Sequence, residues 1–456
     1  MSLFKSFSHR AAILSAAVGL GLASAARADE PSSKQLLDQI NSLQAQVNEL
    51  RAQLQKQPPQ TQPATALPAA QPENSSAAVL RDADRRSQLL QLESLNAGWS
   101  RGRFLLQSED GRYLLHPWFQ LQFRNVTDYR EDVKKGNRDD IQNGFEVRRL
   151  KFGFDGNVIT TDLTYMLQFA VDRKSGTTQL EMAWAKYHLP DTPFSIRGGQ
   201  FKDPVDHEQL LTSKFFVAPD RTLTNDYFVN SEGFVKGASL VYEGNAVHGE
   251  FAFTDGLKGS NQNFQDNPTN VADWGTAGRI EYKAFGDWQD YSHLSALDTK
   301  SNTLVFGAGA DYTESGHTSA LVHVVDGTFL SKSGFEIYAA YLGRYNRQLT
   351  VGKSTFDTYD WTGRLQASYV FDKHWEPFVQ YEYLNFDHNE LAAGSVTHVH
   401  AIRAGVNYFL FGHNAKLTGD VTYLPNGFPA NDDGTGVLAD NHHNEVVVRA
   451  QFQLLL

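Results

Sequence analysis

The last eleven residues of the chain, 446–456, alternate between apolar and polar side chains. One parity is wholly apolar: Val446, Val448, Ala450, Phe452, Leu454 and Leu456. Arg449, Gln451 and Gln453 occupy most of the other parity. Successive side chains of a β-strand point to opposite faces, so this strand has one apolar and one hydrophilic face. In water such a strand would adhere to other chains, whereas in a closed membrane barrel lipid covers one face and a hydrated lumen the other.

The N-terminus has the pattern of a secretory signal peptide. Lys5, His9 and Arg10 precede an apolar run at 11–26, and Ala26-Arg27-Ala28 provides a small-x-small cleavage site. We therefore expect residues 1–28 to be removed on export. The alternative is a retained membrane anchor.

Composition narrows the class of protein. No other window is apolar over the roughly 18 residues that a spanning helix needs. The chain has no cysteine, which suits a fold closed by backbone hydrogen bonds in an oxidising compartment. Its formal net charge of -11 becomes about -14 without the three cations of residues 1–28, which argues against nucleic acid as a partner. An anion-selective pore is still allowed, because selectivity depends on the charges at the constriction.

Residues 29–56 are predicted to form a periplasmic coiled coil. Within 33–56, heptad position a holds Ile40, Val47 and Leu54, and position d holds Leu36, Leu43 and Leu50. This narrow stripe favours an oligomeric coiled coil over an amphipathic helix lying on its own barrel. Residues 57–99 read as a Pro/Gln/Ala-rich linker with a short polar helix at 79–96.

From residue 100 to 456 the chain is aromatic, Gly-rich and alternating, which predicts an all-β fold. At 163–172, for example, Leu163, Tyr165, Leu167, Phe169 and Val171 share one face. The pattern predicts a 16-stranded antiparallel transmembrane β-barrel, preceded by the short coiled-coil helix. The predicted strands are 112–124, 144–156, 161–173, 177–189, 193–202, 236–243, 247–255, 274–284, 301–312, 317–325, 334–343, 358–371, 374–386, 397–410, 413–424 and 444–456.

The connections also alternate in length, which favours a barrel over a soluble sandwich or solenoid. When the connections between predicted strands are numbered along the chain, the odd-numbered ones are mostly long: 125–143, 203–235, 256–273, 344–357, 387–396 and 425–443. Even connections are mostly tight turns. Two break the rule, since 285–300 is long where a turn is expected and 313–316 is short.

The sequence contains no constellation typical of an enzyme and no motif for a cofactor. It lacks a nucleophile elbow, a His-Glu-x-x-His motif and a phosphate-cradling glycine loop. His398 and His400 share a strand face and His442-His443 sit in a loop, but no carboxylate in register completes a metal site. We expect no catalytic, metal or cofactor site.

Charged residues fall on the parity that faces the lumen. The cations are Arg149, Lys151, Arg197, Arg364, Arg403, Lys416 and Arg449, and the acids are Asp172, Glu181, Glu382 and Asp420. Two interpretations stay open. A basic ladder opposite acids would bind small anions weakly enough to release them, or the same charges would only hydrate and brace a wide lumen.

The loop at 203–235 is the predicted constriction. It is the longest connection and carries Thr212, Ser213, Lys214 and Arg221. The apolar run 215–217 would be costly to leave in water, which favours a loop folded inward and packed.

Four stretches of the chain carry a family resemblance. They are Gly-Phe-Glu-Val-Arg-Arg-Leu-Lys-Phe at 144–152, Gly-Gly-Gln-Phe-Lys-Asp-Pro at 198–204, Glu208 through Ser213, and Ala-Pro-Asp-Arg at 218–221. In order and spacing the chain resembles the phosphate-selective porins O and P from about residue 100 onward. The resemblance implies a trimeric sixteen-stranded barrel that passes anions. It also implies an arginine ladder containing Arg148 and Arg149, and a central binding zone with Thr212, Ser213 and Arg221.

The chain departs from that family at three points. Gln209 stands where phosphate-specific members carry a lysine after the loop glutamate, which weakens the case for a multiply charged anion. The final residue is Leu456, where such barrels usually end in phenylalanine. Adjacent Arg148 and Arg149 cannot both face the lumen of a regular strand, so either a bulge is present or only one serves.

These features predict a homotrimeric porin in the outer membrane of a Gram-negative bacterium, in contact with lipid, with its N-terminal segment in the periplasm. It would pass small anions such as phosphate or polyphosphate by passive diffusion. The coiled coil would bundle the N-termini or reach toward the cell wall. The alternatives are a porin for neutral or organic solutes, suggested by Gln209 and the lumen acids, a barrel-anchored tether or adhesin, and a hydrolase for which no residue set is present.

Overall fold

The structure is a computed structural model of the chain. It describes residues 95–100, 103–131, 140–229, 233–257, 272–351, 354–389, 391, 394–432, 434–439 and 442–456. The predicted signal peptide, the coiled coil and nearly all of the predicted linker lie outside these residues and stay predictions.

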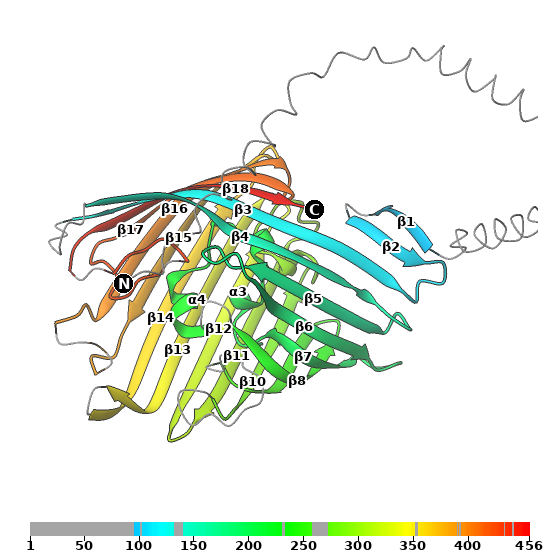
Figure 1. Cartoon of the computed structure of the whole chain (residues 1–456), viewed down its shortest axis with the longest axis horizontal. Helices are drawn as coiled ribbons and strands as arrows, with labels where there is room; N and C mark the ends of the chain where they lie inside the picture. The colour runs from blue at the N-terminus through cyan, green and yellow to red at the C-terminus, as the bar shows by residue number, and fades with distance from the viewer. Residues whose placement is uncertain are drawn as a thin grey trace, which may run out of the picture. The chain divides into compact units, whose positions relative to one another are not determined.

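Sixteen antiparallel strands form a closed barrel, as predicted (Figure 1). Each strand pairs with its sequence neighbours, and β18 closes the ring by pairing with β3 from Glu445↔Arg130 to Leu455↔Gln120. The strands are β3 (Leu114–Arg130), β4 (Ile141–Asn157), β5 (Leu163–Val171), β6 (Thr178–His188), β7 (Phe194–Lys202), β8 (Phe234–Glu243), β9 (Val247–Thr254), β10 (Trp274–Phe285), β11 (Thr303–Ser315), β12 (Thr318–Leu330), β13 (Phe335–Val351), β14 (Ser354–Tyr369), β15 (Trp375–Asn385), β16 (His398–Phe411), β17 (Ala415–Leu424) and β18 (Glu445–Leu455).

A short hairpin precedes the barrel and was not predicted. It consists of β1 (Leu95–Ser100) and β2 (Arg103–Ser108), so it begins inside the segment assigned to the linker. Only Leu106 and Gln107 of β2 pair with β3. Each of the two strands has only six residues, which is too few for the alternation of apolar and polar side chains to stand out in the sequence.

The barrel is apolar outside and polar inside. On β14, the outward Leu365 is 51% exposed, whereas its neighbours Arg364 and Gln366 are each 5% exposed. β18 repeats the pattern with an exposed Val448 beside a buried Arg449. Exposed apolar surface costs roughly 25 cal/mol per Å² in water, so this outer face requires a lipid environment.

The two ends of the barrel differ in their connections. At one end the connections are mostly long, and at the other they are mostly tight turns. The two predicted exceptions are present at 286–302 and at the turn after Ser315. One prediction is wrong: the segment 344–357 is not a long loop. β13 continues to Val351, and β14 already begins at Ser354. Their polar residues, such as Asn346 and Thr358, pair across the two strands instead of forming a loop.

At least three connections fold into the barrel, and one of them, 425–444, contributes Phe428 and Val437 to its apolar cluster and the Thr435 carbonyl as a partner of Arg449. The first, 203–233, contains the helix α3 (His207–Leu210), the 3-10 turn η1 (Ser213–Phe215) and the helix α4 (Leu223–Val229), and Figure 1 shows α3 and α4 within the ring of strands. The second, 286–302, contains η2 (Asp290–Ser292), and its Ala296 and Leu297 pack against Leu330, Val370 and Phe409. None of the helices in the described residues is long and apolar enough to cross a membrane.

The outward face offers a direct test of the fold. Leu365 lies midway along β14 between Trp361 and Tyr369 on the same face, so it is expected at the centre of the bilayer. Replacing Leu365 with Arg should lower the free energy of unfolding by about 2–4 kcal/mol, the cost of a cation at that depth. Urea unfolding in lipid vesicles measures the change. Leu365→Met is the control, and equal stability of the two variants would contradict the outward orientation.

Candidate functional site

The connection between β7 and β8 narrows the lumen, as predicted. Its apolar side chains Phe216, Val217, Leu223 and Phe228 are buried. They belong to one apolar cluster with inward side chains of β12, β13, β15 and β16, which include Val322, Leu342, Phe378 and Val399. The apolar side of the loop therefore packs against the wall made by these strands.

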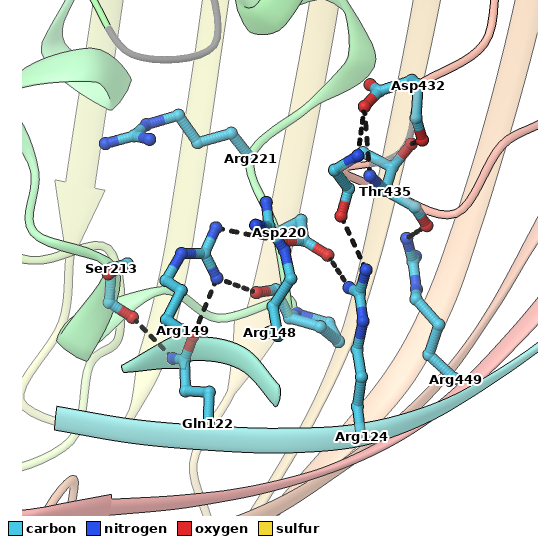
Figure 2. A network of polar contacts seen from close by, with 12 residues as sticks. Gln122, Arg124, Arg148, Arg149, Ser213, Asp220, Arg221, Asp432, Thr435 and Arg449 are labelled. Atoms are coloured by element: carbon cyan, nitrogen blue, oxygen red, sulfur yellow. Dashed lines mark hydrogen bonds and ion pairs between the residues drawn. The ribbon is translucent and has the colours of Figure 1, made fainter. Parts of the chain in front are cut away.

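Asp220 in this loop is clamped by three arginines from β3 and β4 (Figure 2). Its Oδ1 accepts hydrogen bonds from Arg148 Nε at 2.7 Å and Arg149 Nη2 at 2.9 Å, and its Oδ2 accepts one from Arg124. Burial alone would raise the pKa of the Asp220 carboxyl, but the three guanidinium groups hold that pKa well below its usual range. The carboxylate therefore stays charged and fixes the loop to the wall.

A β-bulge lets both adjacent arginines reach Asp220. Gln122 pairs with Arg149 and Phe123 pairs with Val147, so Arg148 is an extra residue on β4 without a partner on β3. The bulge turns Arg148 toward the lumen beside Arg149. The sequence left open whether a bulge is present or only one of the two arginines serves, and the structure contains the bulge.

Three further polar side chains hold the loop through its backbone carbonyls. Arg403 donates to the Asp220 carbonyl at 3.1 Å, Asn407 to that of Val217 at 2.8 Å, and Lys416 to that of Phe216 at 2.5 Å. The second side of the loop is fixed by Arg364, which pairs with Asp206 at 2.5 Å and Glu208 at 2.6 Å.

Several cations that were predicted to bind anions instead pair with carboxylates, carbonyls or aromatic rings of the protein itself. Arg364 and Arg403 hold the loop, and Arg449 pairs with Asp420 and donates to the Thr435 carbonyl. Arg197 pairs with Glu250, and its guanidinium lies 4.0 Å from the centroid of the Phe201 ring. Lys214 lies 3.3 Å from the centroid of the Trp118 ring. None of these five residues lines the main cavity.

The remaining predicted residues meet in that cavity. It has a volume of about 730 Å³ and lies between the loop and the wall made by β4, β5 and β6. Six predicted residues line it: Arg148, Arg149, Lys151, Thr212, Ser213 and Arg221. Their roles in anion binding stay predictions.

Other charged residues of the cavity were not assigned to the predicted site. They are the cations Arg173 and Lys202 and the acids Asp226 and Asp432, together with Asp172 and Glu181, whose lumen positions were predicted. Lys202 is the last residue of β7, directly before the loop, and it lies within the stretch 198–204 that carries the family resemblance. Asp226 and Asp432 are distant in sequence and come together only through folding.

The cations that line the cavity differ in their partners. Lys151 is neutralised by Glu181, with contacts of 2.6 and 2.7 Å. Arg221 donates to the backbone carbonyls of Glu208, Gln209 and Leu211, and Figure 2 shows its guanidinium turned away from Asp220. Donors directed at carbonyls retain their positive charge, so the cavity keeps a cationic wall.

Metal chemistry has no support in the part of the chain that the structure describes. No group of three or more His, Asp or Glu residues there is arranged to hold a metal ion, and the whole sequence lacks cysteine.

A family comparison supports the resemblance noted in the sequence. The family model "Phosphate-selective porin O and P" matches residues 119–270, which include the arginine pair, β7 and the constriction loop. This match confirms the predicted resemblance. No curated protein sequence matches the chain significantly.

Solved porin structures share the fold. An anion-selective porin from Comamonas acidovorans matches with a TM-score of 0.55 and 13% identity, covering 75% of this chain and 99% of that chain. OmpF of Salmonella typhi, in complex with daunomycin, matches with a TM-score of 0.51 and 17% identity, covering 75% and 98%. The outer membrane channel DcaP of Acinetobacter baumannii matches with a TM-score of 0.50 and 12% identity, covering 76% and 99%. At these identities the likeness establishes the porin fold.

The Asp220 clamp predicts a coupled change in stability and conductance. Asp220→Asn should lower the free energy of unfolding by about 3–5 kcal/mol, because it leaves buried arginines without their counter-ion. It should also raise single-channel conductance, because the loop is released from the wall. The matched control is Glu250→Gln, which breaks the pair with Arg197 between β7 and β9 and should leave conductance unchanged. Equal conductance in all three proteins would contradict the clamp.

Two loop residues predict how selectivity depends on pH. Burial lowers the pKa of Lys214 to about 7. Burial and the nearby Asp432 carboxyl raise the pKa of Asp226 to about 8, against the opposing effect of Arg221 and Arg148. As the pH rises from 6 to 9, Lys214 loses a positive charge and Asp226 gains a negative one, so preference for anions should fall. Reversal potentials at each pH measure this, and Asp226→Asn should remove the step near pH 8. A preference for anions that rises with pH would contradict the assignment.

Proposed function

We propose that the chain is an outer-membrane porin that lets small anions cross by passive diffusion. The observation that carries the proposal is the charged cavity of about 730 Å³ beside the constriction loop, lined by Arg148, Arg149, Lys202 and Arg221. A wall of guanidinium and ammonium groups raises the local concentration of anions and lowers that of cations. The match to the family of porins O and P supports the same conclusion.

Phosphate and polyphosphate are candidate solutes within this proposal. Ammonium and guanidinium donors suit phosphate oxygens, and Lys202 and Arg221 both donate to the Leu211 carbonyl, which holds the two cations near each other. Against phosphate, Gln209 replaces a lysine of the phosphate-specific members, and it is fully buried beside Gly233, away from the cavity lining. Competition between phosphate and chloride in single-channel recordings tests this part.

A porin for neutral or organic solutes is the second candidate. Glu181 neutralises Lys151, and Asp432 adds negative charge to the same cavity, joined by Asp226 above its pKa of about 8. The lining is therefore less positive than its arginine content suggests. A channel without preference between potassium and chloride would favour this candidate.

We further propose that the barrel assembles as a homotrimer, with the N-terminal coiled coil in the periplasm. The support is the heptad pattern at 33–56 and the stacked outward pair Phe123 and Phe145, 43% and 72% exposed, which would be covered by a neighbouring barrel. The competing role, a tether or adhesin anchored by the barrel, predicts near-zero conductance after reconstitution.

Reversal potentials in a potassium chloride gradient across planar bilayers test the main proposal. The wild-type channel should prefer chloride. Arg221→Gln and Lys202→Gln should each lower the chloride-to-potassium permeability ratio roughly fivefold, the effect of about 1 kcal/mol from one charge at a hydrated site. Lys332→Gln, in an exposed turn after β12, removes the same charge outside the lumen and should change nothing. A cation preference in the wild-type channel would contradict the proposal.

A further inference from the structure

Another inward connection reaches the constriction loop from the opposite end of the barrel. The loop 203–233 comes from the end with long connections, whereas 286–302 comes from the end with tight turns, which in bacterial barrels faces the periplasm. The two connections meet inside the lumen through buried side chains. No residue of 286–302 lines the cavity of about 730 Å³. Its effect on the charges of that cavity must therefore pass through the constriction loop.

Tyr291 makes the first contact between the two connections. Its ring stacks on that of His207 in α3, with 3.9 Å between the ring centroids and 9° between the ring planes. The Tyr291 hydroxyl donates to Glu281 Oε1 at 3.0 Å and accepts a hydrogen bond from Arg279 Nη2 at 3.1 Å, and both of these partners belong to β10. Both stacked rings are buried. The stack therefore holds α3 against a side chain that β10 keeps in place.

His293 and Ser295 extend the contact along the same connection. The His293 ring lies edge to face with that of Phe215 in η1, with 6.0 Å between the centroids. Ser295 Oγ donates to Glu376 Oε1 at 2.7 Å, and Glu376 Oε2 accepts a hydrogen bond from Asn407 at 2.8 Å. Asn407 in turn holds a backbone carbonyl of the constriction loop. The connection 286–302 thus reaches the constriction loop at three separate points.

The connection 286–302 is fixed within itself and to the barrel. The Asp290 carboxylate accepts hydrogen bonds from the backbone N–H groups of Lys300 at 3.1 Å and Ser301 at 3.0 Å, which closes the connection on itself. Trp288 Nε1 donates to the Asn245 carbonyl at 3.0 Å, which ties its first half to the turn between β8 and β9. An element that is locked in this way is able to hold a second loop in a defined position.

The position of α3 matters because two cations of the cavity are held by its backbone. The Leu211 carbonyl, directly after α3, accepts hydrogen bonds from Lys202 at 2.5 Å and from Arg221 at 3.1 Å. Carbonyls within α3 accept further hydrogen bonds from both cations. Lys202 and Arg221 both line the cavity. A shift of α3 would therefore move two of its positive charges.

We propose that the connection 286–302 is a positioning element for the anion site and that Tyr291 is its principal contact. By holding α3, it fixes where Lys202 and Arg221 stand in the cavity and so sets how strongly the channel prefers anions. Displacing this connection from the tight-turn end changes selectivity even though no residue of the cavity is altered. This inference rests on the proposed porin function and adds a specificity-determining element to it.

Two substitutions of Tyr291 separate its ring from its hydroxyl. Tyr291→Leu removes both, whereas Tyr291→Phe keeps the ring on His207 and removes only the hydroxyl. In planar bilayers with a potassium chloride gradient, Tyr291→Leu should lower the chloride-to-potassium permeability ratio roughly twofold, the change expected when a cation moves from about 4 to about 8 Å from the path of an anion in water. Tyr291→Phe should keep the wild-type ratio. Migration of the unheated protein on a denaturing gel shows whether each variant has folded.

Chemical modification tests the same inference without altering Tyr291. Ser292 is exposed and directly follows Tyr291, and the sequence has no cysteine, so Ser292→Cys creates a single thiol. A maleimide carried by a polyethylene glycol too large for the pore should react from one side of the bilayer only and should shift the permeability ratio. Lys332→Cys, in the exposed turn after β12 at the same end of the barrel, is the matched control. It should react from the same side and leave the ratio unchanged.

The outcomes separate this inference from the porin proposal. A wild-type ratio in folded Tyr291→Leu, an equal fall in Tyr291→Phe, or no shift after modification of Ser292→Cys would each overturn the inference, and the porin proposal would stand if the wild-type channel prefers chloride. Shifts in both tests in a channel that prefers potassium would keep the positioning role and contradict the anion preference. If Tyr291→Leu does not fold, the modification of Ser292→Cys decides alone.

Discussion

The hydrogen bonds between β18 and β3 are the constraint on which the structure depends. Inside a bilayer no water satisfies an unpaired strand edge, so the sheet must close on itself. The closing pairs run from Glu445↔Arg130 to Leu455↔Gln120. Once the sheet is closed, strand alternation sends every second side chain to lipid and the others to the lumen. The chain therefore has a polar interior and an apolar surface.

A polar interior creates a second requirement, because buried charges need partners. Arg124, Arg403 and Arg449 are each about 1% exposed, and each contacts a carboxylate or a loop carbonyl. Asp220 brings these requirements together, since it neutralises arginines of β3 and β4 and fixes the constriction loop at the same time. The apolar side of the loop then packs on the far wall. The passage left open is the cavity beside β4, β5 and β6, whose charges follow from this arrangement.

Much of the fold could be predicted because a strand in a membrane barrel has a strict two-residue period. The exposed Leu365 between buried Arg364 and Gln366 illustrates how directly that period reports orientation. The period is less informative where both faces are polar, as at Asn346 and Thr358, where a long loop was predicted instead of two continuing strands.

The site was predicted less completely than the fold. The parity of Arg364, Arg403 and Arg449 placed them in the lumen, but parity does not show whether a cation faces solvent or a buried carboxylate. Asp220 lay within a stretch that carried the family resemblance, yet its three partners come from two strands that precede it by 71 or more positions along the chain. Asp226 and Asp432 meet only because two loops fold over the same cavity. Contacts of this kind depend on tertiary packing and leave no local pattern.

The central claim is that the channel conducts while the constriction loop is fixed against the barrel wall. The absence of cysteine from the sequence allows a direct test with Ser213→Cys and Gln120→Cys, at two side chains that form a hydrogen bond of 3.1 Å. A short bifunctional thiol-reactive linker should bridge them in the folded, membrane-inserted protein. Single-channel conductance before and after bridging is the decisive measurement. We predict rapid bridging with conductance essentially unchanged, whereas failure to bridge, or closure of the channel on bridging, would contradict the account.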